Sequence, residues 1–71
     1  MKWAKYVDRF GRETGDWIAQ GVSGHFLLWK DGGIWRGLYK QKGADDAKFR
    51  FRKKTLREAK QWCEDNYYWE A

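Results

Sequence analysis

The sequence predicts an α+β fold, in which an antiparallel β-meander packs on one C-terminal α-helix. Two observations predict this class. Between residues 17 and 53, glycine-containing turns separate short segments rich in β-branched and aromatic residues. Beyond residue 54, apolar residues recur at helical spacing behind a capping sequence. We expect three to four strands, or five with a weaker N-terminal segment, in a single domain covering 1–71.

The strands are expected to follow one another through short turns. They are predicted at residues 2–7, 17–22, 25–30, 34–40 and 48–53, and the first of these has the weakest pattern. That first strand would reach the second through a loop at residues 11–15. Ser23-Gly24 and Asp31-Gly32-Gly33 provide the next two turns, and a polar loop at 41–46 leads to the last strand.

The last strand has the clearest alternation in the chain. One of its faces is apolar and is predicted to meet the core, whereas the other is basic and faces solvent. The first face carries Phe49, Phe51 and Lys53, and the second carries Lys48, Arg50 and Arg52.

A helix is predicted over residues 55–68. Thr55 and Glu58 have the spacing of a capping box, which satisfies backbone donors that the first helical turn leaves without partners. The stripe expected to pack on the sheet consists of Leu56, Ala59, Cys63 and Tyr67, with Trp62 to one side of it.

The central hairpin has two registers that the sequence allows, and they exchange the two faces of its strands. A three-residue loop, Asp31-Gly32-Gly33, would bring Trp29, Trp35 and Tyr39 together as an exposed platform for stacking or for a protein interface. A two-residue turn, Gly32-Gly33, would move Trp35 and Tyr39 into the core. It would leave outside a mixed basic and apolar patch of Leu27, Trp29, Arg36, Leu38 and Lys40. In either register one helix cannot cover all the large side chains, so apolar surface should remain.

The net charge of +5 is concentrated in one segment. Residues 48–60 hold seven basic residues and one acidic residue, whereas residues 61–71 hold three acidic residues and no basic one. Bases at the start of a helix and acids at its end oppose the helix dipole, so a role other than helix stability is indicated. A helix start surrounded by cations is suited to phosphate. The predicted phosphate or nucleic-acid contacts are Arg50, Arg52, Lys53, Lys54, Thr55 and Arg57.

Catalysis and metal binding are not predicted. Cys63 is expected to face the core, and His25, the only histidine, lies in a predicted strand. A catalytic pair of a cysteine nucleophile and a histidine base is therefore not expected. Asp45-Asp46 falls in a loop, where turn formation explains it. We therefore expect no catalytic residue, no metal ligand set and no cofactor. We also expect no membrane segment. The single cysteine favours a reducing, cytoplasmic setting.

Two fragments resemble a known layout. Gly15-Asp16-Trp17-Ile18-Ala19, followed by Phe51 and by the helix start from Thr55 to Trp62, is similar to arm-type DNA-binding domains of tyrosine integrases and to AP2-like domains. This resemblance implies a sheet packed on one helix, with the sheet in the major groove. The chain also resembles small tryptophan-rich accessory proteins of phages and prophages, some of which inhibit host defence.

These observations favour a small, non-enzymatic binding protein of phage type that contacts nucleic-acid or nucleotide phosphates, with aromatic side chains beside them. A second interpretation is an inhibitor or adaptor that binds a host protein through exposed aromatics. A third is a homo-oligomeric structural component whose apolar face is covered by its own copy.

Overall fold

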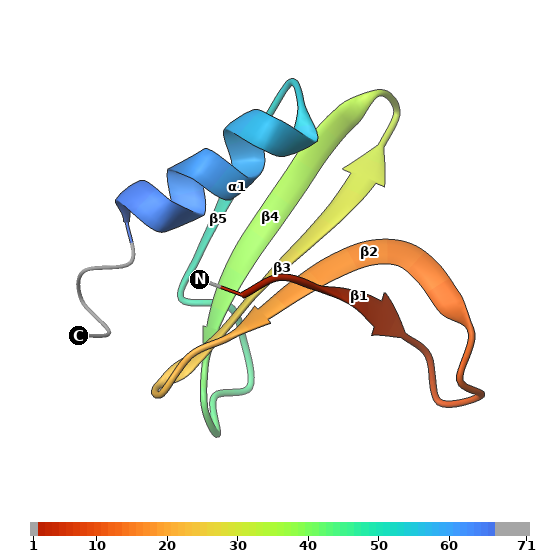
Figure 1. The fold of residues 1–71 in the computed structure, drawn as a ribbon. Coiled ribbons are helices and arrows are strands. Elements are labelled where there is room, and N and C mark those ends of the chain that lie inside the picture. Colours follow the sequence, from red (N-terminus) through yellow and green to blue (C-terminus); the bar gives the residue numbers. More distant parts are fainter. Residues whose placement is uncertain (1, 67–71) are drawn as a thin grey trace.

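The computed structural model describes residues 2–66 and shows the predicted α+β meander (Figure 1). Five antiparallel strands lie in one sheet in the order β1-β2-β3-β4-β5, followed by one helix. Their bounds are β1 Ala4–Val7, β2 Glu13–Gln20, β3 Gly24–Asp31, β4 Ile34–Gln41, β5 Phe49–Lys53 and α1 Leu56–Asp65. The weak N-terminal pattern therefore does form a strand, β1. Within the described residues, no helix is long and apolar enough to cross a membrane.

The second strand, β2, differs from the expectation at both of its ends. β2 begins at Glu13, so the predicted loop at 11–15 is wrong, and Gly15 lies inside the strand. β2 also ends at Gln20, and Val22 stands in the following turn with 83% of its surface exposed. The strand is longer at its start because it pairs there with β1, a partner that its own polar residues do not reveal.

The central hairpin has the two-residue turn. Asp31 pairs with Ile34 and Phe26 pairs with Tyr39, which leaves Gly32-Gly33 as the turn. Both glycines have positive φ, 59° and 84°, as a type I′ hairpin requires. The platform of the three-residue loop is therefore not formed.

The core lies between α1 and the covered face of the sheet. Its buried hydrophobic residues are Ala19, Phe26, Leu28, Tyr39, Ala59 and Cys63. Figure 1 shows α1 lying across β4 and β5, the strands that it contacts most. Rings extend the core outward over β5: Tyr39 stacks on Phe49, with their centroids 5.4 Å apart.

The helix begins as predicted. Thr55 Oγ1 accepts a hydrogen bond of 3.1 Å from the Glu58 backbone N–H, which is the N-cap interaction. Trp62 is more than a flanking residue, because it stacks on Phe51 with their centroids 4.0 Å apart. Tyr67, predicted to continue the helical stripe, lies outside the described residues.

Candidate functional site

One face of the sheet is covered by α1, and no described element covers the other, which we call the open face. Strand pairing brings its side chains into rows, with Ile18 beside Leu27, Leu27 beside Leu38, and Leu38 beside Arg50. The residues of the open face include Ile18, Leu27, Trp29, Arg36, Leu38, Lys40, Arg50 and Arg52. It is the mixed basic and apolar patch that the two-residue turn predicts, extended onto β2 and β5.

Three arginines gather on the β4–β5 side of the open face. Arg36 and Arg52 are direct cross-strand neighbours, and Arg50 lies on the same face of β5. Like charges directly opposite each other in a sheet are destabilising. Together with Phe51, the three arginines line a depression of about 290 Å³. Placing these guanidinium groups side by side is therefore electrostatically unfavourable.

Two of these arginines are held by nearby carboxylates. Arg36 Nε lies 2.8 Å from Asp31 Oδ2, and Arg50 Nη2 lies 3.2 Å from Asp46 Oδ1. These side chains remain exposed, 44% for Arg36 and 61% for Arg50, so the pairs orient the guanidinium groups without burying them. Arg52 has no acidic partner among residues 2–66. The face therefore keeps donors available to an anion.

Asp46 has two roles at this edge. Its Oδ1 accepts a hydrogen bond of 2.8 Å from the Ala47 backbone N–H as well as the bond from Arg50. The Ala47 N–H, followed by the Arg50 guanidinium, lowers the pKa of Asp46 below its usual value of 3.8. The carboxylate is thus ionised at neutral pH, forms the turn expected at this loop and orients Arg50.

The structure does not bring all the predicted phosphate contacts together. Arg50 and Arg52 are on the open face, whereas Lys53 is half-buried on the covered side, in a depression also lined by Glu58 and Trp62. Lys54 and Thr55 occupy the exposed turn before α1. The basic segment is divided because strand alternation sends neighbouring residues to opposite faces.

Arg57, the last of the predicted phosphate contacts, lies elsewhere. It lines a groove of about 470 Å³ beside Trp3 and Leu56. The Thr55 hydroxyl already accepts the Glu58 N–H, so the helix start is less open to a ligand than its sequence suggests.

The predicted stacking residues are also separated. Tyr39 is fully buried and Trp35 packs against the core cluster, so neither presents a free ring on the open face. Trp29 is half-buried there beside Arg36, its cross-strand partner. Arg36 was not among the predicted phosphate contacts, although the two-residue turn places it outside with the basic patch. The turn length was the signal that would have selected it.

The chemistry of the buried groups is that of a core. Burial, with a smaller effect from Glu64, raises the pKa of the Cys63 thiol to about 12, which leaves little nucleophilic thiolate at neutral pH. No group of three His, Cys, Asp or Glu side chains that would hold a metal occurs in the described part of the chain. Comparisons with family models, curated proteins and solved structures found no match.

Proposed function

We propose that this protein binds nucleic acid without catalysis, through phosphate contacts made by arginines of the open face. The observation that carries the proposal is the gathering of Arg36, Arg50 and Arg52 on adjacent strands despite their mutual repulsion. Guanidinium groups bind phosphate oxygens through paired, charge-assisted hydrogen bonds. A bound polyanion would offset the repulsion among these side chains, because each guanidinium group would then lie beside a negative charge.

The shape of the site favours an extended nucleic acid over a single nucleotide. Pockets for small ligands enclose most of the ligand surface, whereas these arginines are exposed around a depression on a sheet face. The neighbouring surface is apolar, with Leu38 and the half-buried Trp29 adjoining the cations. Cations beside apolar and aromatic side chains contact both the backbone and the bases of a nucleic acid.

The test is the salt dependence of binding to a short fluorescent duplex and to its single strand, measured by anisotropy. The variant Arg50→Gln/Arg52→Gln removes two phosphate contacts. We expect weaker binding and a slope of log affinity against log salt that is shallower by about 2. The effect should be uniform across sequences because phosphates carry no sequence information.

The matched control, Lys30→Gln/Lys42→Gln, removes the same charge away from the open face. Lys30 alternates with the buried Leu28 and so points to the covered side, and Lys42 is in the turn after β4. The control should bind like wild type. Equal weakening of both variants would mean that only net charge matters, and affinity unaffected by salt would contradict phosphate contacts altogether.

The apolar row on the same face favours a second candidate, a protein interface. Ile18, Leu27 and Leu38 are adjacent and half-buried, and a host protein or a second copy of the chain would cover them. Association through this row would respond little to salt. Light scattering tests for an oligomer. Self-association of the wild type that Leu38→Lys abolishes would support an oligomer, whereas a wild-type protein that stays monomeric at every salt concentration would argue against one.

A further inference from the structure

The β1–β2 hairpin extends beyond the rest of the sheet as an arm, which we define as residues 5–16. β2 pairs with β3 only from Trp17 to Gln20, while its earlier half continues beside β1. Figure 1 shows this hairpin diverging from β3 and β4. Across the arm, Lys5 Nζ lies 3.7 Å from Glu13 Oε2. Within residues 2–66, the arm is therefore a paired ribbon without a third strand beside it.

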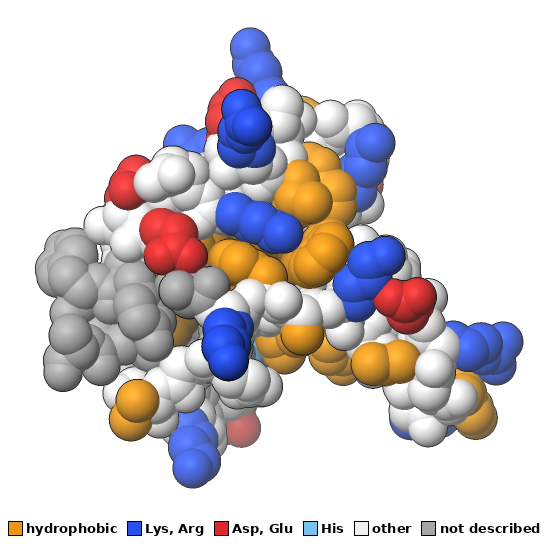
Figure 2. All heavy atoms as spheres, in the orientation of Figure 1, with side chains coloured by type: hydrophobic (Ala, Val, Ile, Leu, Met, Phe, Trp, Pro, Cys, Tyr) orange, Lys and Arg blue, Asp and Glu red, His pale blue; other side chains and the backbone are white. Residues whose placement is uncertain are grey.

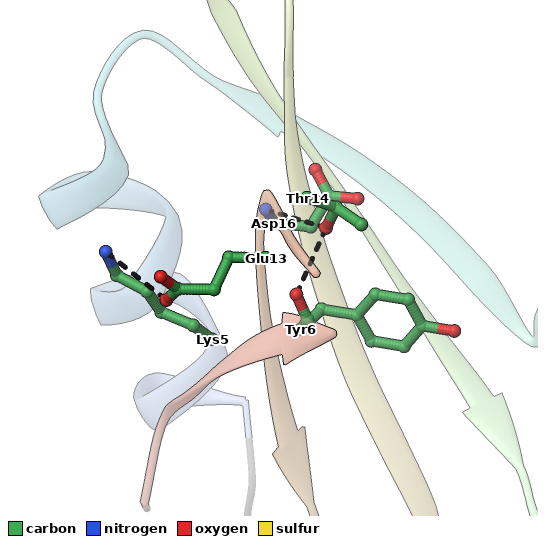
Figure 3. Close-up of polar contacts among 5 residues, drawn as sticks. All are labelled: Lys5, Tyr6, Glu13, Thr14 and Asp16. Atoms are coloured by element: carbon green, nitrogen blue, oxygen red, sulfur yellow. Dashed lines mark hydrogen bonds and ion pairs between the residues drawn. The ribbon is translucent and has the colours of Figure 1, made fainter. Parts of the chain in front are cut away.

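A β-bulge directs the arm away from the sheet. The pairing of β1 with β2 shifts after Lys5, and Gly15 has a φ of 90° at this point. The Thr14 hydroxyl fills the irregularity by donating to the Tyr6 carbonyl at 3.3 Å and accepting from the Asp16 N–H at 3.2 Å (Figure 3). Bulges of this kind bend a strand and increase its twist. The side-chain bonds hold the bend in one geometry.

The tip of the arm is a closed and ordered turn. Asp8 Oδ1 accepts hydrogen bonds from the backbone N–H groups of Phe10, at 2.8 Å, and Arg12, at 3.0 Å. The Asp8 N–H in turn donates to the Arg12 carbonyl at 2.9 Å. Gly11, with a φ of 79°, permits the reversal. The turn is thus organised before any partner binds, which lowers the entropy cost of binding.

This turn presents an apolar ring close to two cations. Phe10 is 66% exposed, and its ring centroid lies 5.0 Å from Arg9 Cζ and 5.3 Å from Arg12 Cζ. Neither arginine has an ion-pair partner among the residues that the structure describes. Figure 2 shows the projecting hairpin at the lower right, with hydrophobic and basic side chains together at its end. Packing of the fold does not explain so exposed a ring.

We infer that the arm enters the minor groove of double-stranded DNA and inserts Phe10 between two base pairs, with Arg9 and Arg12 against the groove walls. The inference rests on the proposed function, because the open face supplies the phosphate contacts that hold the duplex. The minor groove has a strong negative potential where it is narrow, which attracts arginine. Apolar wedges that enter it unstack a base step and kink the duplex.

The size of the arm favours a groove over a lipid surface. Membrane-binding elements bury a broad apolar face, whereas the only large apolar side chains that the arm exposes are Tyr6, Val7 and Phe10, and Phe10, the most exposed of them, lies beside two arginines. The Cα atoms span 29 × 29 × 22 Å, comparable to one helical turn of a duplex, about 34 Å, so a bound duplex would be contacted over a short stretch.

The test uses a duplex that carries 2-aminopurine, whose fluorescence rises when the base is unstacked. Wild type should raise the emission, Phe10→Leu should retain much of the rise because it keeps an apolar wedge, and Phe10→Ala should abolish it. Phe10→Ala should also bind about tenfold more weakly. Val22→Ala, which truncates an exposed apolar residue in another turn, should behave as wild type.

The outcomes separate this inference from the proposed function. Salt-dependent binding without any rise in emission would overturn the wedge and leave the phosphate contacts intact. Absence of binding to both the duplex and its single strand would overturn both, whereas binding to the single strand alone would overturn only the wedge. Phe10-dependent binding to anionic phosphatidylglycerol vesicles, without unstacking of the duplex, would also overturn the wedge and assign the arm to a lipid surface.

Discussion

Gly37 shows how one residue determines the packing of two strands. It is the cross-strand partner of Phe51, and a Cβ at this position would overlap the Phe51 ring. The absence of a side chain lets the ring lie over β4 and stack on Trp62. The alternation of Phe49 and Phe51 predicted the inward face of β5, but the need for Gly37 arises only when the partner strand is known.

We expect Gly37→Ala to lower the free energy of unfolding by about 1–3 kcal/mol, because Phe51 must leave its stack on Trp62. Urea denaturation measures the change. In a Phe51→Leu background the same substitution should cost less, since the obstructing ring is gone, and a double-mutant cycle would report the coupling. A Gly37→Ala protein as stable as wild type would show that β4 and β5 adapt freely.

Among the elements, the β3–β4 hairpin determines which side chains reach the open face. Its pattern of alternating large residues predicts both strands, yet a turn of two or three residues fits the sequence equally well. The choice is made by the rest of the sheet, since only the two-residue turn places Tyr39 against Phe26 and Phe49 under α1. The helix needed no such context, because its cap and apolar stripe are local.

The type I′ turn predicts that its glycine positions, both at positive φ, tolerate asparagine but not a β-branched residue. Gly32→Asn should leave stability unchanged or raise it by up to about 1 kcal/mol, because asparagine tolerates positive φ and restricts the unfolded chain. Gly33→Val should lower stability by about 1–2 kcal/mol, because a β-branched residue at positive φ is strained. Thermal unfolding followed by circular dichroism compares them. A Gly33→Val protein as stable as the Gly32→Asn protein would argue against a positive φ at residue 33.

The whole molecule has a core limited to the helix and the central strands, with large residues left at its margins. The sequence predicted uncovered apolar surface on the central hairpin, and the two-residue turn does leave a mixed basic and apolar patch there. Among residues 2–66, the aromatic side chains that are exposed are Tyr6 and Phe10, both in the arm. The bulge that carries them away from the sheet depends on a pairing that their own segment specifies only weakly.

The stability of this core should fall at alkaline pH. Burial of Cys63 raises the pKa of its thiol from 9.0 to about 12, so between these values the unfolded chain loses a proton that the folded chain keeps. The unfolded state then binds fewer protons, and the free energy of unfolding decreases as pH rises through this range. Urea titrations above pH 9 should show a steeper decline for wild type than for Cys63→Ala. Parallel declines would assign the effect to other groups.

The sequence by itself determined the class of fold, the strand and helix order, and which residues of β5 face outward. These follow from periodicity and capping, which act over a few neighbouring residues. Only the tertiary structure decided the register of the central hairpin, the pairing of Arg36 with Arg52, and the departure of the arm from the sheet. A period of two specifies which residues share a face of one strand, but the rows across strands depend on turn length and on contacts between distant segments.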